Sequence, residues 1–221
     1  MTEYVDIFTK DNHKFQAYLS QPNQKVKGGI VIIQEIFGVN DHIKEVCNLY
    51  SNHGYLTIAP CLFDRENKNI ELDYDQEGIM EGRRLKELLN ELSINEIESS
   101  ISFVESAGKV GVIGYCWGGS LSWKAACKFN NLSSSIIYYG GDVPKLKNLT
   151  PKCPTMCHFG ELDQSIPIDE VKKFKKLNQN VNVFTYPADH GFNCNHRNQY
   201  NKKCSDIALE RSLGFLEKNL N

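Results

Sequence analysis

The sequence predicts an α/β fold with a mostly parallel central sheet and helices on both faces. Two observations lead to this prediction. Continuous apolar runs, such as 28–33 and 109–115, are typical of strands that are buried on both faces of a sheet. Such runs alternate with segments of helical period, such as 41–52, and this alternation is typical of parallel sheets covered by helices.

Strands and helices can be placed in order along the chain. A polar turn, Asp11-Asn12-His13, separates two short strands and predicts a hairpin of 3–9 and 14–19. Apolar runs predict further strands at 28–33, 55–59, 109–115, 136–139, 154–159 and 181–186. Apolar residues three or four positions apart predict helices at 41–52, 85–92, 94–104, 117–129, 171–177 and 205–220.

Segment 67–82 is polar and predicts neither a clear helix nor a clear strand. No internal repeat, low-complexity tract or linker interrupts the order of elements. A chain of 221 residues is an ordinary length for one α/β domain. We therefore expect a single domain over residues 1–221.

Composition limits the classes of partner. The 25 basic and 27 acidic side chains give a net charge of −2, so no broad positive field is available to hold nucleic acid phosphates. The N-terminal residues show neither a signal peptide nor an apolar run long enough to span a membrane. We expect a cytoplasmic monomer that binds a small molecule and neither nucleic acid nor membrane.

The eight cysteines, at positions 47, 61, 116, 127, 153, 157, 194 and 204, follow no repeated spacing. In a cytoplasmic protein most of them are expected to be reduced core residues. Strand alternation points His158 away from Cys153 and Cys157, which argues against a metal site there. His190, Cys194 and His196 lie close in the sequence and could suggest zinc, but a catalytic role explains His190 better. No metal or cofactor is therefore predicted.

One cysteine stands in a motif of its own. Residues Gly114–Gly119 read Gly-Tyr-Cys-Trp-Gly-Gly, where a buried strand meets a helix. Gly114 and Gly118, two residues before and after Cys116, allow strand and helix to approach closely, as in a nucleophile elbow with cysteine in place of serine. The N-terminus of the following helix favours the thiolate, which is the reactive form of the side chain.

An acid and a histidine follow the elbow in the order that such a site requires. Asp163 comes after the strand that ends near Gly160, and His190 comes after the strand that ends at Tyr186. The carboxyl ends of parallel strands meet at one edge of the sheet. This joint placement predicts a Cys116-Asp163-His190 catalytic triad.

The chemistry assigns a role to each residue. Cys116 attacks an acyl carbon, His190 accepts and returns the proton, and Asp163 holds the imidazole in the required tautomer. The oxyanion of the intermediate needs two backbone donors. We expect these to be the amides of Trp117 and of Ile36, which lies in the loop after strand 28–33.

Glu35 directly follows a buried apolar strand, which is an unusual position for a carboxylate. A surface or helix-entry carboxylate is the ordinary interpretation. Its place beside the expected oxyanion loop favours a role in the site instead. Glu35 is therefore a candidate for pairing with the cysteine and controlling which form of the thiol is present.

The chain resembles the dienelactone hydrolase family of α/β-hydrolases, also named carboxymethylenebutenolidases. The resemblance covers essentially the whole sequence. It is carried by the segment Gln34–Asn40, the elbow Gly114–Gly119, Asp163 with Pro167, and His190-Gly191-Phe192, together with the C-terminal residues Arg197, Tyr200, Ala208, Arg211 and Phe215.

The resemblance implies an α/β-hydrolase fold, a Cys-Asp-His triad and hydrolysis of an unsaturated lactone that bears a carboxylate. It also implies that Glu35 keeps the resting thiol protonated and that arginines hold the substrate carboxylate. One such arginine would fall near Gly78, but the nearest ones here are Arg83 and Arg84. The other would follow His190 closely, where Arg197 is the candidate.

Together these features predict a cofactor-free hydrolase of small esters or lactones that works through a cysteinyl acyl-enzyme. Two alternatives remain open from the sequence. One is a binding protein that kept the fold without the activity, because fold alone does not imply function. The other is a thiol redox sensor built on Cys116, which would need a resolving cysteine nearby.

Overall fold

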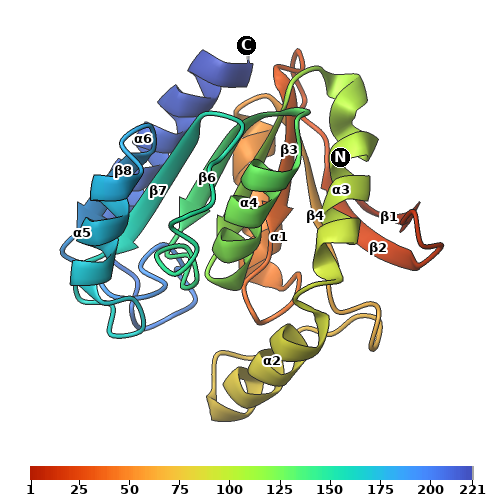
Figure 1. Cartoon of the computed structure of the whole chain (residues 1–221). Coiled ribbons are helices and arrows are strands. Elements are labelled where there is room, and N and C mark those ends of the chain that lie inside the picture. Colours follow the sequence, from red (N-terminus) through yellow and green to blue (C-terminus); the bar gives the residue numbers. More distant parts are fainter. Residues whose placement is uncertain (221) are drawn as a thin grey trace.

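The computed structural model describes residues 1–220, which build one eight-stranded sheet in the order β1-β2-β4-β3-β5-β6-β7-β8 (Figure 1). The strands are β1 (Thr2–Phe8), β2 (Lys14–Ser20), β3 (Gly28–Ile33), β4 (Tyr55–Pro60), β5 (Val110–Tyr115), β6 (Leu132–Tyr138), β7 (Thr155–Gly160) and β8 (Asn182–Tyr186). The helices are α1 (Asp41–Asn52), α2 (Gln76–Leu89), α3 (Ser93–Val104), α4 (Trp117–Lys128), α5 (Ile168–Leu177) and α6 (Lys202–Leu220), with a short 3-10 turn at Glu105–Ala107.

Strand directions confirm the predicted fold class. Strand β2 is antiparallel to both of its neighbours, β1 and β4. All strand pairs from β4 through β8 are parallel. The carboxyl ends of these six strands therefore lie at one edge of the sheet, which is where open α/β sheets place their ligands.

Both faces of the sheet are covered, and side chains alternate between the two cores. In β3, Ile30 and Ile32 join the core that includes residues of α1 and α6, whereas Val31 and Ile33 join the core that includes residues of α3 and α4. Figure 1 shows α3 and α4 in front of the sheet and α1 behind it. A strand buried on both faces explains why the run at 28–33 is continuously apolar.

Several predicted elements have different limits in the structure; helix α5, for example, begins at Ile168 instead of residue 171. Strand β6 begins at Leu132, four residues before the predicted start, because Ser134 and Ser135 are buried in the strand despite their polarity. Helix α2 begins at Gln76, inside the segment without a clear period, where the Asp75 side chain accepts a hydrogen bond from the amide of Gly78. Helix α6 begins at Lys202 instead of residue 205.

The turn from β5 into α4 requires glycine because backbones approach closely there. A Cβ atom on Gly114 would lie 1.9 Å from the carbonyl oxygen of Gly118. A Cβ atom on Gly118 would in turn lie 2.2 Å from the carbonyl oxygen of Ile33. The two glycines thus bring the start of α4 against the end of β3.

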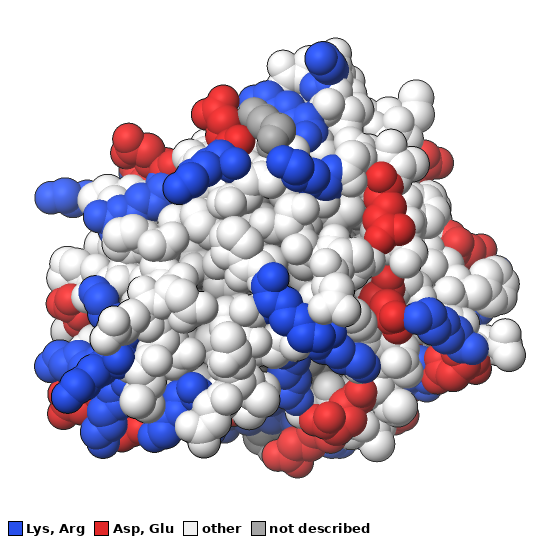
Figure 2. All heavy atoms as spheres, turned by 45° about the horizontal axis from the view of Figure 1, so that its top comes forward, with Lys and Arg blue, Asp and Glu red and all other residues white. Residues whose placement is uncertain are grey.

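Charges are mixed on the face of the molecule that Figure 2 shows. Basic and acidic side chains both lie on that face with uncharged surface between them, and no continuous basic surface covers it. Within residues 1–220, no helix combines the length and the apolar character that crossing a bilayer requires.

We predict that Gly118→Ala lowers the free energy of unfolding by about 3 kcal/mol or more, because the new methyl group meets a backbone carbonyl that cannot move aside. Urea unfolding followed by circular dichroism measures this loss. Gly214→Ala is the matched control: Gly214 lies in α6, and a Cβ atom added there would have no other atom within 4 Å, so alanine should raise stability by up to about 1 kcal/mol. Equal stabilities of the two variants would contradict the close approach.

Candidate active site

Four loops meet at the carboxyl edge of the sheet, and each carries one part of the candidate site. They follow β3, β5, β7 and β8, and they bring Ile36, Cys116, Asp163 and His190 to one region. A cavity of about 510 Å³ opens there, and Ile36, Cys116 and His190 lie in its wall. Helix α2 stands below the sheet in Figure 1 and contributes Ile79, Arg83 and Lys86 to the same wall.

Cys116 occupies the turn between β5 and α4. Its backbone has a conformation that residues other than glycine rarely adopt. Its φ is 54° and its ψ is −114°, and it is the N-cap residue of α4. Its amide donates a hydrogen bond to the carbonyl of Tyr138, at 3.0 Å, which ties the turn to β6. A strained conformation held by such contacts is common at functional sites, and here it presents the thiol to the cavity.

His190 connects the thiol with a carboxylate. Its Nε2 atom lies 3.1 Å from Sγ of Cys116, and its Nδ1 atom lies 2.6 Å from Oδ2 of Asp163. The His190 side chain is 17% exposed, whereas that of Asp163 is fully buried. The structure therefore brings the three residues of the predicted triad into one continuous chain of contacts.

The Asp163 carboxylate is fixed by its own loop. Its Oδ1 atom accepts hydrogen bonds from the amides of Ser165, at 2.8 Å, and Ile166, at 3.2 Å. This leaves Oδ2 for the His190 ring. An acid held in this way orients the imidazole and defines which ring nitrogen faces the thiol.

The two neighbours of His190 change its protonation. Burial by itself would lower the pKa of the imidazole. The negative charge that Cys116 can carry and the hydrogen bond with Asp163 outweigh that effect and raise the pKa to about 10. These two contacts therefore favour the protonated form of the ring, which can donate Nε2–H to the sulfur of Cys116.

The expected oxyanion donors lie beside the thiol. Ile36 and Trp117 both line the cavity together with Cys116. Trp117 is the first residue of α4, where an amide has no carbonyl partner within the helix. The indole of Trp117 is anchored by a hydrogen bond to Asn90, at 3.0 Å, and stacks on Phe63.

Glu35 is buried, but its partners differ from those expected. Its Oε1 atom accepts a hydrogen bond from Arg197 and its Oε2 atom accepts one from the Tyr74 hydroxyl, both at 3.3 Å. Among the described residues no hydrogen bond joins Glu35 to Cys116. Direct pairing of Glu35 with the thiol therefore remains a prediction, while its carboxylate is balanced here by the Arg197 guanidinium.

Two arginines reach the cavity. Arg197 lies in its wall, and its guanidinium packs over the rings of Phe37 and Tyr74. Arg83 also lines it, and among residues 1–220 its side chain has no ion-pair or hydrogen-bond partner. Arg84, the next residue, is outside the lining and pairs with Glu81 and Glu66.

The histidines that the sequence places near cysteines have other side-chain partners in the structure. His158 is buried and bonds to the Tyr186 and Ser212 hydroxyls, and burial lowers its pKa to about 3. His196 pairs with Glu45, at 3.0 Å, away from His190. All eight cysteines are free, and burial raises the pKa of the thiol of Cys127 to about 12 and that of Cys153 to about 11.

Three residues near the site carry no signal in the sequence. The sequence predicts Tyr139 in a strand, but its φ is 40° and its ring packs 5.0 Å from that of His190. Tyr74 comes from the polar segment for which the sequence predicts no element. His42 lies on the buried face of α1. None of them belongs to a recognisable motif, so only the folded chain brings them to the site.

Comparisons with known proteins identify the family of this chain. The model of the family described as "Dienelactone hydrolase family" matches residues 15–220. The chain belongs to the dienelactone hydrolase family. It is thus an ester hydrolase with the α/β-hydrolase fold.

Individual relatives cover nearly the full chain. The carboxymethylenebutenolidase of Pseudomonas putida is 30% identical over 98% of this chain and 96% of its own. The structure of a dienelactone hydrolase-like promiscuous phosphotriesterase from metagenomic libraries is similar with a TM-score of 0.79 and 14% identity, covering 100% of this chain and 99% of that one. An esterase of Pyrococcus furiosus is similar with a TM-score of 0.74 and 15% identity, covering 100% and 92%. At such identities the structural likeness shows the fold alone.

We predict that the His190 ring stays protonated well above neutral pH and loses this property when the thiol is removed. In Cys116→Ala its pKa should fall by about 1–3 pH units, because the largest of the effects that raise it is gone. NMR titration of the histidine ring nitrogens measures the change. Cys127→Ala, on the far end of α4, should leave the titration unaltered. A ring that titrates near pH 6.5 in the unmodified chain would refute the prediction.

Proposed function

We propose that this chain hydrolyses small carboxylic esters or lactones through a cysteinyl acyl-enzyme, with Cys116, His190 and Asp163 as its triad. The observation that carries this proposal is the continuous contact from Asp163 through His190 to the Cys116 thiol. The names of the carboxymethylenebutenolidase relatives support an ester or lactone as substrate.

In the first half of the reaction the Cys116 thiolate attacks the acyl carbon and a carbon–sulfur bond forms. The electron pair of the carbonyl moves onto its oxygen, where the amides of Ile36 and Trp117 donate to it. When the intermediate collapses, the carbon–oxygen bond to the alcohol breaks. His190 gives its Nε2 proton to the departing alkoxide, and this transfer is favoured by the protonated state of the ring at neutral pH.

In the second half, water replaces the alcohol. The neutral His190 ring accepts a proton from water as its oxygen attacks the thioester carbon, and the same two amides stabilise the second oxyanion. The carbon–sulfur bond then breaks and releases the acid. The thiolate and the protonated ring are restored, and Asp163 keeps the ring in place throughout.

The cavity also indicates what substrates it selects. Lys86 lies in its wall but is already paired with Asp142, at 3.2 Å, as is Lys145. Arg83 has no such partner among the described residues. A guanidinium without an ion pair on a cavity wall binds carboxylates in a bidentate manner. We therefore assign to Arg83 the recognition of an anionic group on the substrate.

We expect Cys116→Ala to lose at least about a thousandfold in kcat, because no other group can form the acyl-enzyme. Cys116→Ser should also lose most activity, since the site is arranged around a thiolate and not a hydroxyl. Release of p-nitrophenol from p-nitrophenyl acetate and of acid from a dienelactone measures both. Cys127→Ser, on the same helix, is the control that should keep wild-type rates. Unchanged turnover in Cys116→Ala would exclude Cys116 as the nucleophile and overturn the proposed acyl-enzyme.

Arg83→Gln should raise KM about tenfold or more for esters that carry a carboxylate and leave neutral esters unaffected, because a charged hydrogen bond is worth about 1.5–3 kcal/mol. Steady-state kinetics on matched charged and neutral esters separate these effects. Arg84→Gln is the control, since Arg84 is paired with acidic residues outside the cavity. Equal effects of Arg83→Gln on the two esters would exclude anion recognition by Arg83.

A further inference from the structure

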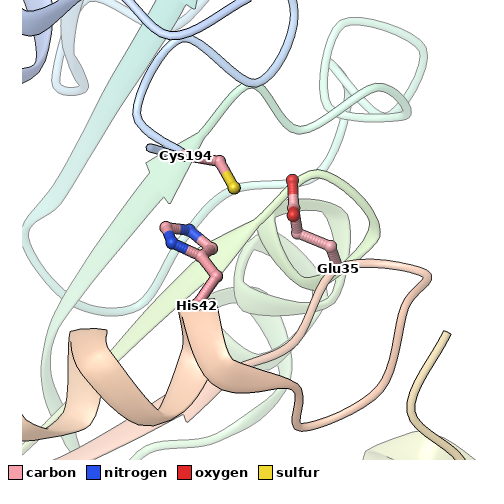
Figure 3. Close-up of side chains that lie close together, drawn as sticks. All are labelled: Glu35, His42 and Cys194. Carbon is pink, nitrogen blue, oxygen red and sulfur yellow. The ribbon is translucent and has the colours of Figure 1, made fainter. Parts of the chain in front are cut away.

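Three side chains that could bind a metal converge in the protein interior beside the candidate active site. Glu35 comes from the loop after β3, His42 from the first turn of α1, and Cys194 from the loop after β8. One oxygen, one nitrogen and one sulfur ligand atom of these residues all lie within 4.8 Å of one another. Figure 3 shows the Cys194 sulfur directed into the space between the His42 ring and the Glu35 carboxylate.

His42 is the observation that points to a ligand. Its side chain is 2% exposed, and among the described residues neither ring nitrogen has a hydrogen bond of good geometry, although the Asn195 side chain lies near the ring. A buried imidazole without partners is costly, and in its neutral form it offers a lone pair to a metal.

We propose that Glu35, His42 and Cys194 form a binding site for a Zn²⁺ ion. The set of one carboxylate, one imidazole and one thiolate matches the ligands of zinc. Tetrahedral zinc holds its ligand atoms roughly 3.4 Å apart, so small rotations of the side chains suffice to close the present spacing. Three protein ligands leave the fourth position for water.

The charges of the site suit a divalent ion. Glu35 and a Cys194 thiolate supply two negative charges and His42 is neutral, so the three ligands balance a Zn²⁺ ion once Arg197 has left the Glu35 carboxylate. Binding breaks the S–H bond of Cys194 and releases that proton to solvent. One proton should therefore leave for each ion that binds a Cys194 side chain in its thiol form.

An access route is present. A second cavity, of about 220 Å³, reaches His42 from the surface and is lined also by Glu45 and Asn195. The ion would approach His42 through this cavity. Binding also has a cost, because Arg197 must share or lose the Glu35 carboxylate, its present partner.

The site is distinct from the catalytic thiol, so the test removes that thiol. In the full-length Cys116→Ala chain, calorimetric titration with Zn²⁺ should show one ion per chain and release of about one proton, measured by comparing buffers of different ionisation enthalpy. Co²⁺ should give a thiolate-to-metal charge-transfer absorption band. No binding, or a band without thiolate character, would overturn the proposal.

Variants in the same Cys116→Ala background assign the ligands. His42→Gln and Cys194→Ser should each weaken binding more than about tenfold. His196→Gln and Cys204→Ser are the matched controls, since His196 pairs with Glu45 and Cys204 lies on α6, and both should bind as before. Equal affinity in all four variants would show adventitious binding and reject the site.

A further measurement uses no variant of the proposed ligands. It therefore tests the site even if His42→Gln or Cys194→Ser fails to fold. An ion that binds only the folded chain raises its Tm. Zn²⁺ should raise the Tm of Cys116→Ala and slow the alkylation of Cys194 by iodoacetamide, as mapped on peptides, more than that of the other cysteines. Protection of a different cysteine, or of none, would contradict the assignment. Because these readouts do not use catalysis, they are independent of the proposed hydrolytic mechanism.

Discussion

The sharp turn at Cys116 is the constraint on which the rest of the site depends. Residues with a positive φ other than glycine are rare, and this one is held because α4 starts against the end of β3 and the Cys116 amide is bonded to β6. Three neighbouring strands thus fix one thiol. Because these contacts hold the turn, the thiol has a defined position. The loops after β7 and β8 place Asp163 and His190 next to it.

A second layer of the site concerns charge in the interior. The Glu35 carboxylate is 1% exposed, and a buried carboxylate is tolerated only with compensation. Arg197 and Tyr74 provide it now, while His42 and Cys194 also lie close to it. Glu35 therefore stands between two possible sets of partners. Glu35 is buried, and the next residue, Ile36, lines the cavity, so the buried charge lies one residue away from the cavity wall.

Much of this architecture could be predicted from the sequence, because the features concerned are local or periodic. The continuous apolar run at 28–33 indicates a strand buried on both faces, and the glycines of the elbow indicate the turn. Strand β6 is harder to predict, because its serines are polar and suggest an exposed segment. They are buried in the structure, where the Ser135 hydroxyl donates a hydrogen bond to the carbonyl of Ser122. The surroundings of Glu35 could not be predicted, because Tyr74 and His42 reach it from segments with no motif, and which residues meet there depends on how those segments pack.

Helix α2 differs from the other helices in how it is attached. It stands away from the sheet in Figure 1 and packs instead on the loop after β3, where its Gly82 lies against the carbonyl of Ile36. It supplies wall residues to the cavity but none of the triad. A family built in this way can acquire new substrates by replacing one peripheral helix, while the strained turn and the strand ends that hold the reactive groups are inherited unchanged. Substrate range and catalytic machinery are then free to evolve separately.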